Sequence, residues 1–326
     1  MRNFCSLCVW ISTLLTLGSS AVQAKPLPFT PTFTSIVNAR AGGINTNSPL
    51  DSRSNNTGAP LIARSDYTYP DSLLGSSSAG SFSSAEAGAL HVSAEASAGV
   101  NAPRNTQYVT TGNANAVAAY SDRFIVHSLN QLDGARGTMT VALGIDGTLT
   151  GGGDGSPIGS GSNGGWSGTS WWQVSAQISS TFNEGGYGGI HQIFGHNLSA
   201  NQAGSSQTGP NTFGDQYLTF DFIFGSSIYI NLRAEVSASS GASNNFHSAS
   251  SYASSFSADL SHTVSWGGIT DIRDANGNLV SSYSALSDAT GYNYAQAYVA
   301  PVPLPSSIWL FGTGILGFLG LKSRKH

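Results

Sequence analysis

Charge is scarce in this sequence: Asp, Glu, Lys and Arg make up only 9% of its 326 residues. Between residues 25 and 301, nine Lys and Arg stand against seventeen Asp and Glu, which gives a net charge of −8. A nucleic-acid-binding protein needs a basic surface to neutralise phosphates, so this balance disfavours that function. Solubility must rest mainly on Ser, Thr, Asn and Gly, a composition that suits a neutral, secreted surface.

Cysteine is almost absent, because the chain has only Cys5 and Cys8. Both lie in the apolar run Phe4–Leu17, which follows a positively charged residue and precedes the small residues Val22-Gln23-Ala24. These features predict an N-terminal signal helix within a signal peptide, residues 1–24, that is removed on export. The mature chain then has no cysteine, which excludes disulfides and thiol catalysis.

Helical periodicity is also missing between the two ends of the chain. Apolar and polar residues alternate instead, as expected for half-buried strands. We therefore predict an all-β fold of about ten strands, arranged as a two-sheet antiparallel sandwich with jelly-roll-like topology. A β-helix is the alternative, but the sequence has no fixed short repeat. The alternating segments are Leu90–Ala96, Met139–Ile145, Trp172–Ile178, Leu218–Phe224 and Ile228–Val236, with further strands at 256–266 and 269–282 and a hairpin turn at Asn276-Gly277.

The remaining segments are poorly patterned. Residues 25–78 are rich in Pro, Ser and Asn and are interpreted as a leader with edge strands at 30–37 and 61–67. The glycine cluster Gly151–Gly155 is typical of a mobile loop. The β-sandwich ectodomain is accordingly predicted to span residues 79–300.

The C-terminal tail has three parts. Val302-Pro303-Leu304-Pro305 precedes an uncharged, largely apolar stretch at 306–321, and a basic cluster at 322–326 ends the chain. A helix of this length rises about 24 Å, slightly less than the roughly 30 Å hydrocarbon core of a bilayer. We expect a single transmembrane helix with the basic end on the cytoplasmic side.

This tail resembles the PEP-CTERM sorting signal of Gram-negative bacteria in its VPLPA variant, although Ser306 replaces the Ala of that variant. The resemblance implies processing near the Pro motif by an exosortase, a membrane transpeptidase. It also implies export across the inner membrane, transient anchoring through the C-terminal helix, and delivery to the cell surface or to an exopolysaccharide matrix. The residues that match are Val302, Pro303, Leu304, Pro305, Trp309, Leu310, Phe311, Gly312, Gly314, Leu316 and Gly317.

Metal-binding and catalytic patterns are weak. His191 and His196 are five residues apart, which places them on opposite faces of a strand. Asp274, with the two asparagines that follow it, imitates the start of a calcium loop, but Gly and Glu are missing from the required positions. Asp215 and Asp221 are the acids considered for glycoside hydrolysis, and we do not assign them that role. We expect no cofactor, no bound metal and no enzymatic activity.

The aromatic group Trp166, Trp171, Trp172 and Tyr187 is the best ligand candidate, because a flat indole face can stack on a sugar ring. Trp171 and Trp172 must point to opposite faces of a regular strand, so one of them belongs to the core. Packing in the core or under a loop is the simpler interpretation of the group.

Two function classes therefore remain. The first is a non-enzymatic surface or matrix protein, sorted by an exosortase and linked to exopolysaccharide and biofilm. The second is a carbohydrate-binding module or adhesin that uses an exposed Trp or Tyr.

Overall fold

The structure is a computed structural model that describes residues 29–43, 46–47, 50–57, 59, 61–68, 74–103, 106–158, 164–181, 187–208, 213–244 and 249–300. The predicted signal peptide and the sorting tail, including Val302, Pro303, Leu304 and Pro305, lie outside the described residues, as do both predicted terminal helices. The described part is all-β, and it contains no helix that could cross a membrane.

One sheet, called sheet A, has nine strands in the order β11-β10-β9-β13-β7-β1-β2, with β3 attached to β1 and β15 attached to β7. All its pairs are antiparallel. Its strands are β1 (Thr32–Gly43), β2 (Thr46–Asn47), β3 (Asp51–Asn55), β7 (Val109–Ser128), β9 (Gly165–Thr181), β10 (Tyr187–Asn201), β11 (Gly204–Thr208), β13 (Ser227–Ser243) and β15 (Tyr283–Ser287).

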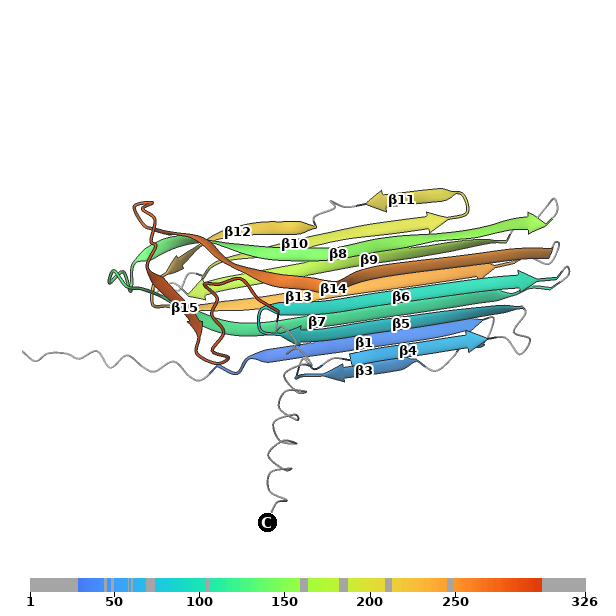
Figure 1. Cartoon of the computed structure of the whole chain (residues 1–326), viewed down its shortest axis with the longest axis horizontal. Helices are drawn as coiled ribbons and strands as arrows, with labels where there is room; N and C mark the ends of the chain where they lie inside the picture. Colours follow the sequence, from blue (N-terminus) through green and yellow to red (C-terminus); the bar gives the residue numbers. More distant parts are fainter. Residues whose placement is uncertain are drawn as a thin grey trace, which may run out of the picture.

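The other sheet, called sheet B, has six antiparallel strands in the order β12-β8-β14-β6-β5-β4. It packs face to face on sheet A, and the long strands of both sheets run along the length of the molecule (Figure 1). Its strands are β4 (Leu61–Thr68), β5 (Gly75–Glu86), β6 (Ala89–Ala102), β8 (Arg136–Ile158), β12 (Gly214–Ile223) and β14 (Ala249–Asp274).

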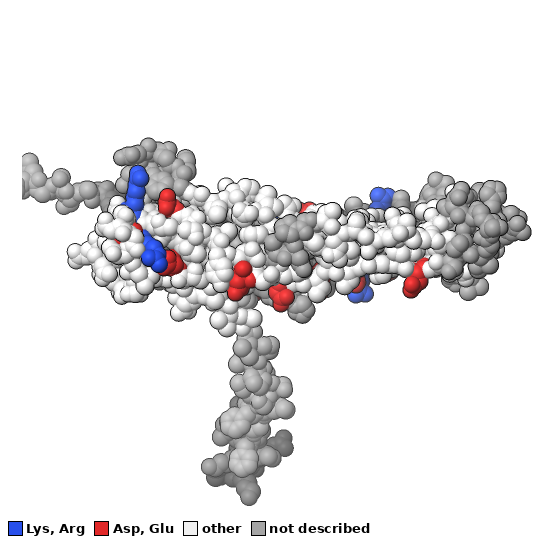
Figure 2. Space-filling view, turned by 90° about the horizontal axis from the view of Figure 1, so that it is seen from above, with Lys and Arg blue, Asp and Glu red and all other residues white. Residues whose placement is uncertain are grey.

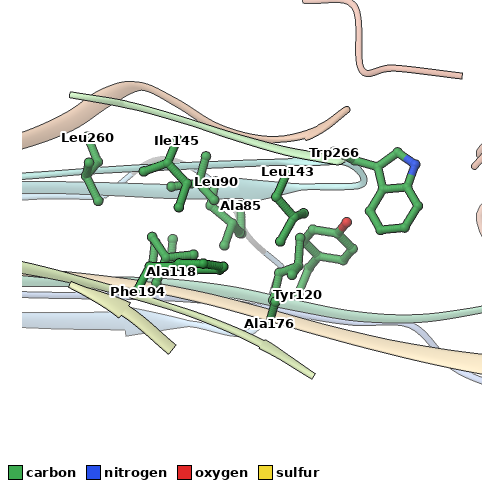
Figure 3. Close-up of a cluster of buried hydrophobic side chains, with 14 of the residues drawn as sticks. Ala85, Leu90, Ala118, Tyr120, Leu143, Ile145, Ala176, Phe194, Leu260 and Trp266 are labelled. Atoms are coloured by element: carbon green, nitrogen blue, oxygen red, sulfur yellow. The ribbon is translucent and has the colours of Figure 1, made fainter. Parts of the chain in front are cut away.

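The core lies between the two sheets and is built by period-two alternation. In β13 every second residue is buried, and the residues between them face outward. Figure 3 shows the two layers of side chains meeting: Leu90, Leu143 and Ile145 come from sheet B. Ala118 and Ala176 face them from sheet A. Many core positions are alanine, so each of these positions buries little apolar surface and the core extends over a long interface between the sheets.

The two-sheet antiparallel sandwich is confirmed. Four of the five alternating segments lie within strands, and the fifth, Leu218–Phe224, extends one residue beyond the end of β12. The segments expected as separate strands at 256–266 and 269–282 are not separate: 256–266 and 269–274 are joined in β14, whose register shifts let it bend without ending. Residues 275–282 form the turn after β14 and an isolated bridge between Arg273 and Leu279 instead of a strand. The turn at Asn276-Gly277 is present, with Gly277 at a φ of 83°. Nine and six strands exceed the eight of a jelly roll, but the chain does cross repeatedly between the sheets, as in that topology.

The sandwich also includes residues assigned to the leader. β1 pairs with β7 along its whole length, and β4 forms an edge of sheet B, so both predicted edge-strand segments are strands. The predicted boundary at residue 79 falls inside β5.

The mobile loop predicted at Gly151–Gly155 is wrong, because these residues continue β8 and pair with β14. Glycine is required here by close packing. A Cβ added to Gly151 would lie 2.2 Å from the ring of Phe256, and one on Gly153 would lie 2.4 Å from the ring of Trp166. The glycines make room for core aromatic rings.

Candidate functional site

The outer face of sheet A carries a shallow polar groove of about 660 Å³ that crosses five strands. Its floor follows the strand register: Ser239 on β13 lies opposite Asn113 on β7 and opposite Thr169 on β9. Among the described residues that line it, none is charged. Its main polar residues are Thr111, Asn113, Ser167, Thr169, Ser199, Asn201, Ser205, Ser206 and Ser239.

The groove is polar because it is lined mainly by the outward-facing residues of these strands, which are Ser, Thr and Asn, while the apolar residues between them face the core. Short hydroxyl side chains facing outward leave the surface flat, and Gly241 adds no side chain at all. Neighbouring hydroxyls bond across strands, as between Thr169 Oγ1 and Ser239 Oγ at 3.0 Å. The groove can therefore offer several donors and acceptors at fixed spacing to a neutral polar ligand.

Trp171 continues the outer face of β9 two residues beyond Thr169. Its neighbours across the strands are Ser237 and Asn197, both small and polar. The side chain is half-buried. Trp171 therefore places an aromatic surface about 7 Å along the strand from the groove floor, since alternate residues of a strand are separated by that distance.

The other aromatic candidates are placed differently. Trp172 is only 1% exposed and stacks on Phe213, with ring centroids 5.0 Å apart. This confirms that the two adjacent tryptophans point to opposite faces. Trp166 is half-buried and packs against the core. The side chain of Tyr187 lies outside the described residues. Trp171 alone among the described candidates faces outward beside the groove.

The two histidines of β10 are not brought together. His191 Nε2 lies 3.1 Å from Ser175 Oγ, and His196 Nε2 lies 3.3 Å from Gln207 Oε1. Their odd spacing puts them on opposite faces of the strand. Among the described residues, no group of three or more His, Cys, Asp or Glu could hold a metal ion.

Asp274 caps the hairpin turn that follows β14. Its Oδ1 accepts the backbone N–H groups of Asn276 and Asn278, each at 2.9 Å, and its Oδ2 accepts Nδ2 of Asn278 at 2.9 Å. The side-chain bond from Asn278, followed by these backbone bonds, lowers the pKa of Asp274. The residues that imitate a calcium loop thus form hydrogen bonds to one another within a turn.

Asp215 and Asp221 are both exposed on β12. Six residues of strand separate them, which corresponds to about 20 Å. Paired glycosidase carboxylates lie roughly 5 to 10 Å apart. These two acids cannot act on one glycosidic bond.

A buried carboxylate that the sequence did not reveal, Asp122, lies near the end of β7. Its oxygens accept hydrogen bonds from Ser287 Oγ at 2.9 Å, Thr290 Oγ1 at 2.8 Å and the Tyr294 hydroxyl at 2.8 Å. Its Oδ1 also accepts the backbone N–H of Arg123 at 2.7 Å. All three side-chain donors come from residues 283–298, which we call the C-terminal strap.

The strap closes one part of the core with aromatic rings. Tyr294 stacks on Phe124 with centroids 4.5 Å apart, and its backbone oxygen accepts Nε1–H of Trp266 at 2.8 Å. The backbone N–H of Tyr298 bonds to the Trp266 oxygen at 2.7 Å. The folded body therefore fixes the chain up to Tyr298, four residues before Val302. In the sequence, the two tyrosines at 292 and 294, placed two residues apart, were the one feature that could have pointed to a packed segment here.

The fold and this surface define an all-β sandwich with a weakly charged, hydroxyl-rich exterior, and charged residues are sparse on the side seen in Figure 2. Comparison with known proteins adds one match: the family model of the PEP-CTERM protein-sorting motif covers residues 301–325. The chain thus carries a C-terminal sorting domain, which marks it as an exported protein sorted by an exosortase. No curated protein and no solved structure matches it.

Proposed function

We propose that this is a non-enzymatic surface or extracellular-matrix protein, linked to exopolysaccharide and biofilm, on a Gram-negative bacterium. The observation that carries the proposal is the sorting motif at 301–325, which follows directly on a folded body. The signal peptide directs the precursor across the inner membrane, and the C-terminal helix anchors it until the exosortase acts.

The chemistry of the described body supports this role. The candidate histidines and Asp274 are engaged in local hydrogen bonds, and the candidate glycosidase acids are too far apart. A long, weakly charged sandwich whose exterior is rich in Ser, Thr and Asn suits a structural component in a hydrated polysaccharide.

The sorting route is tested by replacing both Pro303 and Pro305 with Ala in the full-length chain expressed in its native host. We expect a tail-bearing precursor to accumulate in the inner membrane and the surface form to decrease, because the exosortase is expected to act at this motif. Replacing Ser306 with Ala is the matched control and should leave sorting intact. Normal surface delivery of the Pro variant would contradict the proposal.

A second candidate function is carbohydrate binding, and the groove beside Trp171 favours it. An uncharged row of hydroxyls and amides can bond to sugar hydroxyls, while the indole covers the apolar face of a ring. Binding is measured by pull-down of the surface protein with the host's exopolysaccharide. Trp171→Ala should reduce retention, whereas Tyr217→Ala, an exposed aromatic on sheet B, should not. Equal retention of both variants would remove this candidate.

A further inference from the structure

The two sheets differ in charge. The strands of sheet B contain ten Asp and Glu and three Arg, which gives a net charge of −7. Those of sheet A contain three Asp and Glu and four Arg, which gives +1. None of the ten acids of sheet B is buried. Because a surface of one sign attracts ligands of the opposite sign, the exposed side of sheet B should favour a cationic ligand and disfavour an anionic one.

The outer face of sheet B is hollowed by a groove of about 330 Å³ that crosses β4, β5, β6, β14 and β8. Its floor follows the strand register: Phe82 on β5 lies opposite Ile62 on β4 and opposite Ser93 on β6. Asp259 on β14 lies on the other side of Ser93. Phe82 is half-buried, and in the described chain it contacts no other aromatic ring. The groove therefore places an apolar ring about 10 Å from a carboxylate, two strands away.

Glu95 brings a second carboxylate close to this ring. It lies opposite Gly80, which is two residues from Phe82 on β5. A Cβ added to Gly80 would lie 2.8 Å from Glu95 Oε1, so the carboxylate occupies the space that the glycine leaves. No hydrogen bond or ion pair within the described chain engages Glu95. Its carboxylate is thus available to a ligand that rests on Phe82.

The other charged groups of the groove are also only partly used. Asp259 Oδ1 accepts the backbone N–H of Ser261 at 2.7 Å, a bond that does not involve Oδ2. Arg64 lines the groove on β4, and among the described residues it forms no ion pair with Glu95 or Asp259. A guanidinium only donates hydrogen bonds, so it suits a hydroxyl or carbonyl oxygen. The groove offers two anionic acceptors, one donor and an apolar ring.

We propose that this groove binds a polysaccharide of amino sugars with free amino groups, such as a partly de-N-acetylated glucosamine polymer. The ammonium groups bond to Glu95 and Asp259 in charge-assisted hydrogen bonds. The apolar C–H face of a sugar ring rests on Phe82, and Arg64 donates to a hydroxyl or acetamido oxygen.

The position of the groove favours a sugar over a basic peptide. Peptides commonly dock by adding a strand to a sheet edge or by laying a helix into an apolar groove. The central strands under this groove, β5, β6, β14 and β8, are each paired on both sides, so their backbone groups are already used. The groove is also lined by both charged and polar side chains, which match the amines and hydroxyls of a sugar.

This inference deepens the proposed function and rests on it for the source of the polymer, the extracellular matrix. It concerns a different face from the groove beside Trp171, which lies on sheet A and is uncharged among its described lining residues. Sorting does not depend on the sheet B groove, so surface delivery and polymer binding can be measured separately.

Binding is measured by calorimetric titration of the full chain, purified from its native host, with a short glucosamine oligomer and with its fully N-acetylated form. We expect the amine form alone to bind, and binding to weaken as salt is raised and as alkaline pH removes the ammonium charge. Glu95→Gln combined with Asp259→Asn should weaken binding at least about tenfold, because both charge-assisted hydrogen bonds are lost.

The matched control combines Asp215→Asn with Asp221→Asn, which removes the same charge from β12. Asp215 lies opposite Gly144, four residues along β8 from Thr148 in the groove. That separation is about 13 Å, more than the screening length of about 8 Å at physiological salt. The control should therefore bind the glucosamine oligomer almost as well as the unsubstituted protein.

A second variant tests the ring. Phe82→Leu keeps an apolar side chain but removes the flat face, and it should weaken binding several-fold while thermal unfolding stays unchanged. The proposal is overturned by equal binding of the two oligomers, by equal loss in the two double variants, or by unchanged binding in Phe82→Leu. Polylysine that binds as tightly as the glucosamine oligomer would also overturn it and would assign the face to cationic polymers in general. Any of these results with normal surface delivery leaves the proposed function standing, whereas failed delivery with the expected binding contradicts that function alone.

Discussion

The Tyr294 hydroxyl provides a sharp test of how the C-terminal strap is held. Tyr294→Phe keeps the ring that stacks on Phe124 and removes the hydroxyl that donates a hydrogen bond to Asp122. A hydrogen bond to a charged group contributes about 1.5–3 kcal/mol. At about 2–4 °C per kcal/mol for a domain of this size, we expect the melting temperature to fall by about 3–12 °C.

Thermal unfolding followed by circular dichroism measures this change, and limited proteolysis reports whether the strap is released first. Tyr217→Phe is the matched control, because Tyr217 is 62% exposed and its hydroxyl is not part of the Asp122 network. Asp122→Ala should be far more severe, since it leaves three side-chain donors without their acceptor, and the two buried donors, Ser287 and Tyr294, cost about 1–3 kcal/mol each when unpaired. A Tyr294→Phe protein as stable as the control would refute the reasoning.

Three further predictions concern the strap, β8 and the turn. Burial, together with the nearby negative charge of Glu86, raises the pKa of Tyr292 to about 12. Its contribution to stability is therefore present below about pH 10 and is lost as the pH rises towards 12. The melting temperature should fall less over this pH range in Tyr292→Phe than in the unsubstituted protein. Gly151→Ala should destabilise the body by about 1–3 kcal/mol in denaturant titration, whereas Gly152→Ala, whose Cβ would meet nothing within 4 Å, should have little effect. The pKa of Asp274 is lowered, so its stabilising effect on the turn is present above about pH 4 and is lost when the carboxylate is protonated at lower pH. Below that pH, hydrogen exchange of the backbone amides should increase at this turn and not in the strands.

The sequence was informative where one face of a strand is buried and the other is wet. Alternation in Ile228–Val236 predicted β13, and the adjacent Trp171 and Trp172 were correctly assigned to opposite faces. The same logic fails where glycine replaces an inward side chain. Gly151–Gly155 looks like a loop because the residues that fill the space, Phe256 and Trp166, belong to other strands.

The pairing partners also could not be predicted. β1 was expected only as an edge strand because its Pro-rich surroundings hide its full register with β7. The Asp122 network joins residues more than 160 positions apart, and a single Asp within an alternating strand gives no local sign of burial. The groove likewise depends on the order of strands in sheet A, which no local pattern encodes.

We infer that a removable export signal delivers a folded β body to the cell surface. Intact-mass analysis of the surface protein from its native host tests it most directly. The mass should correspond to a chain that lacks residues 1–24 and ends near the Val302–Pro305 motif. A surface protein that still carries Trp309 to His326 would contradict the account.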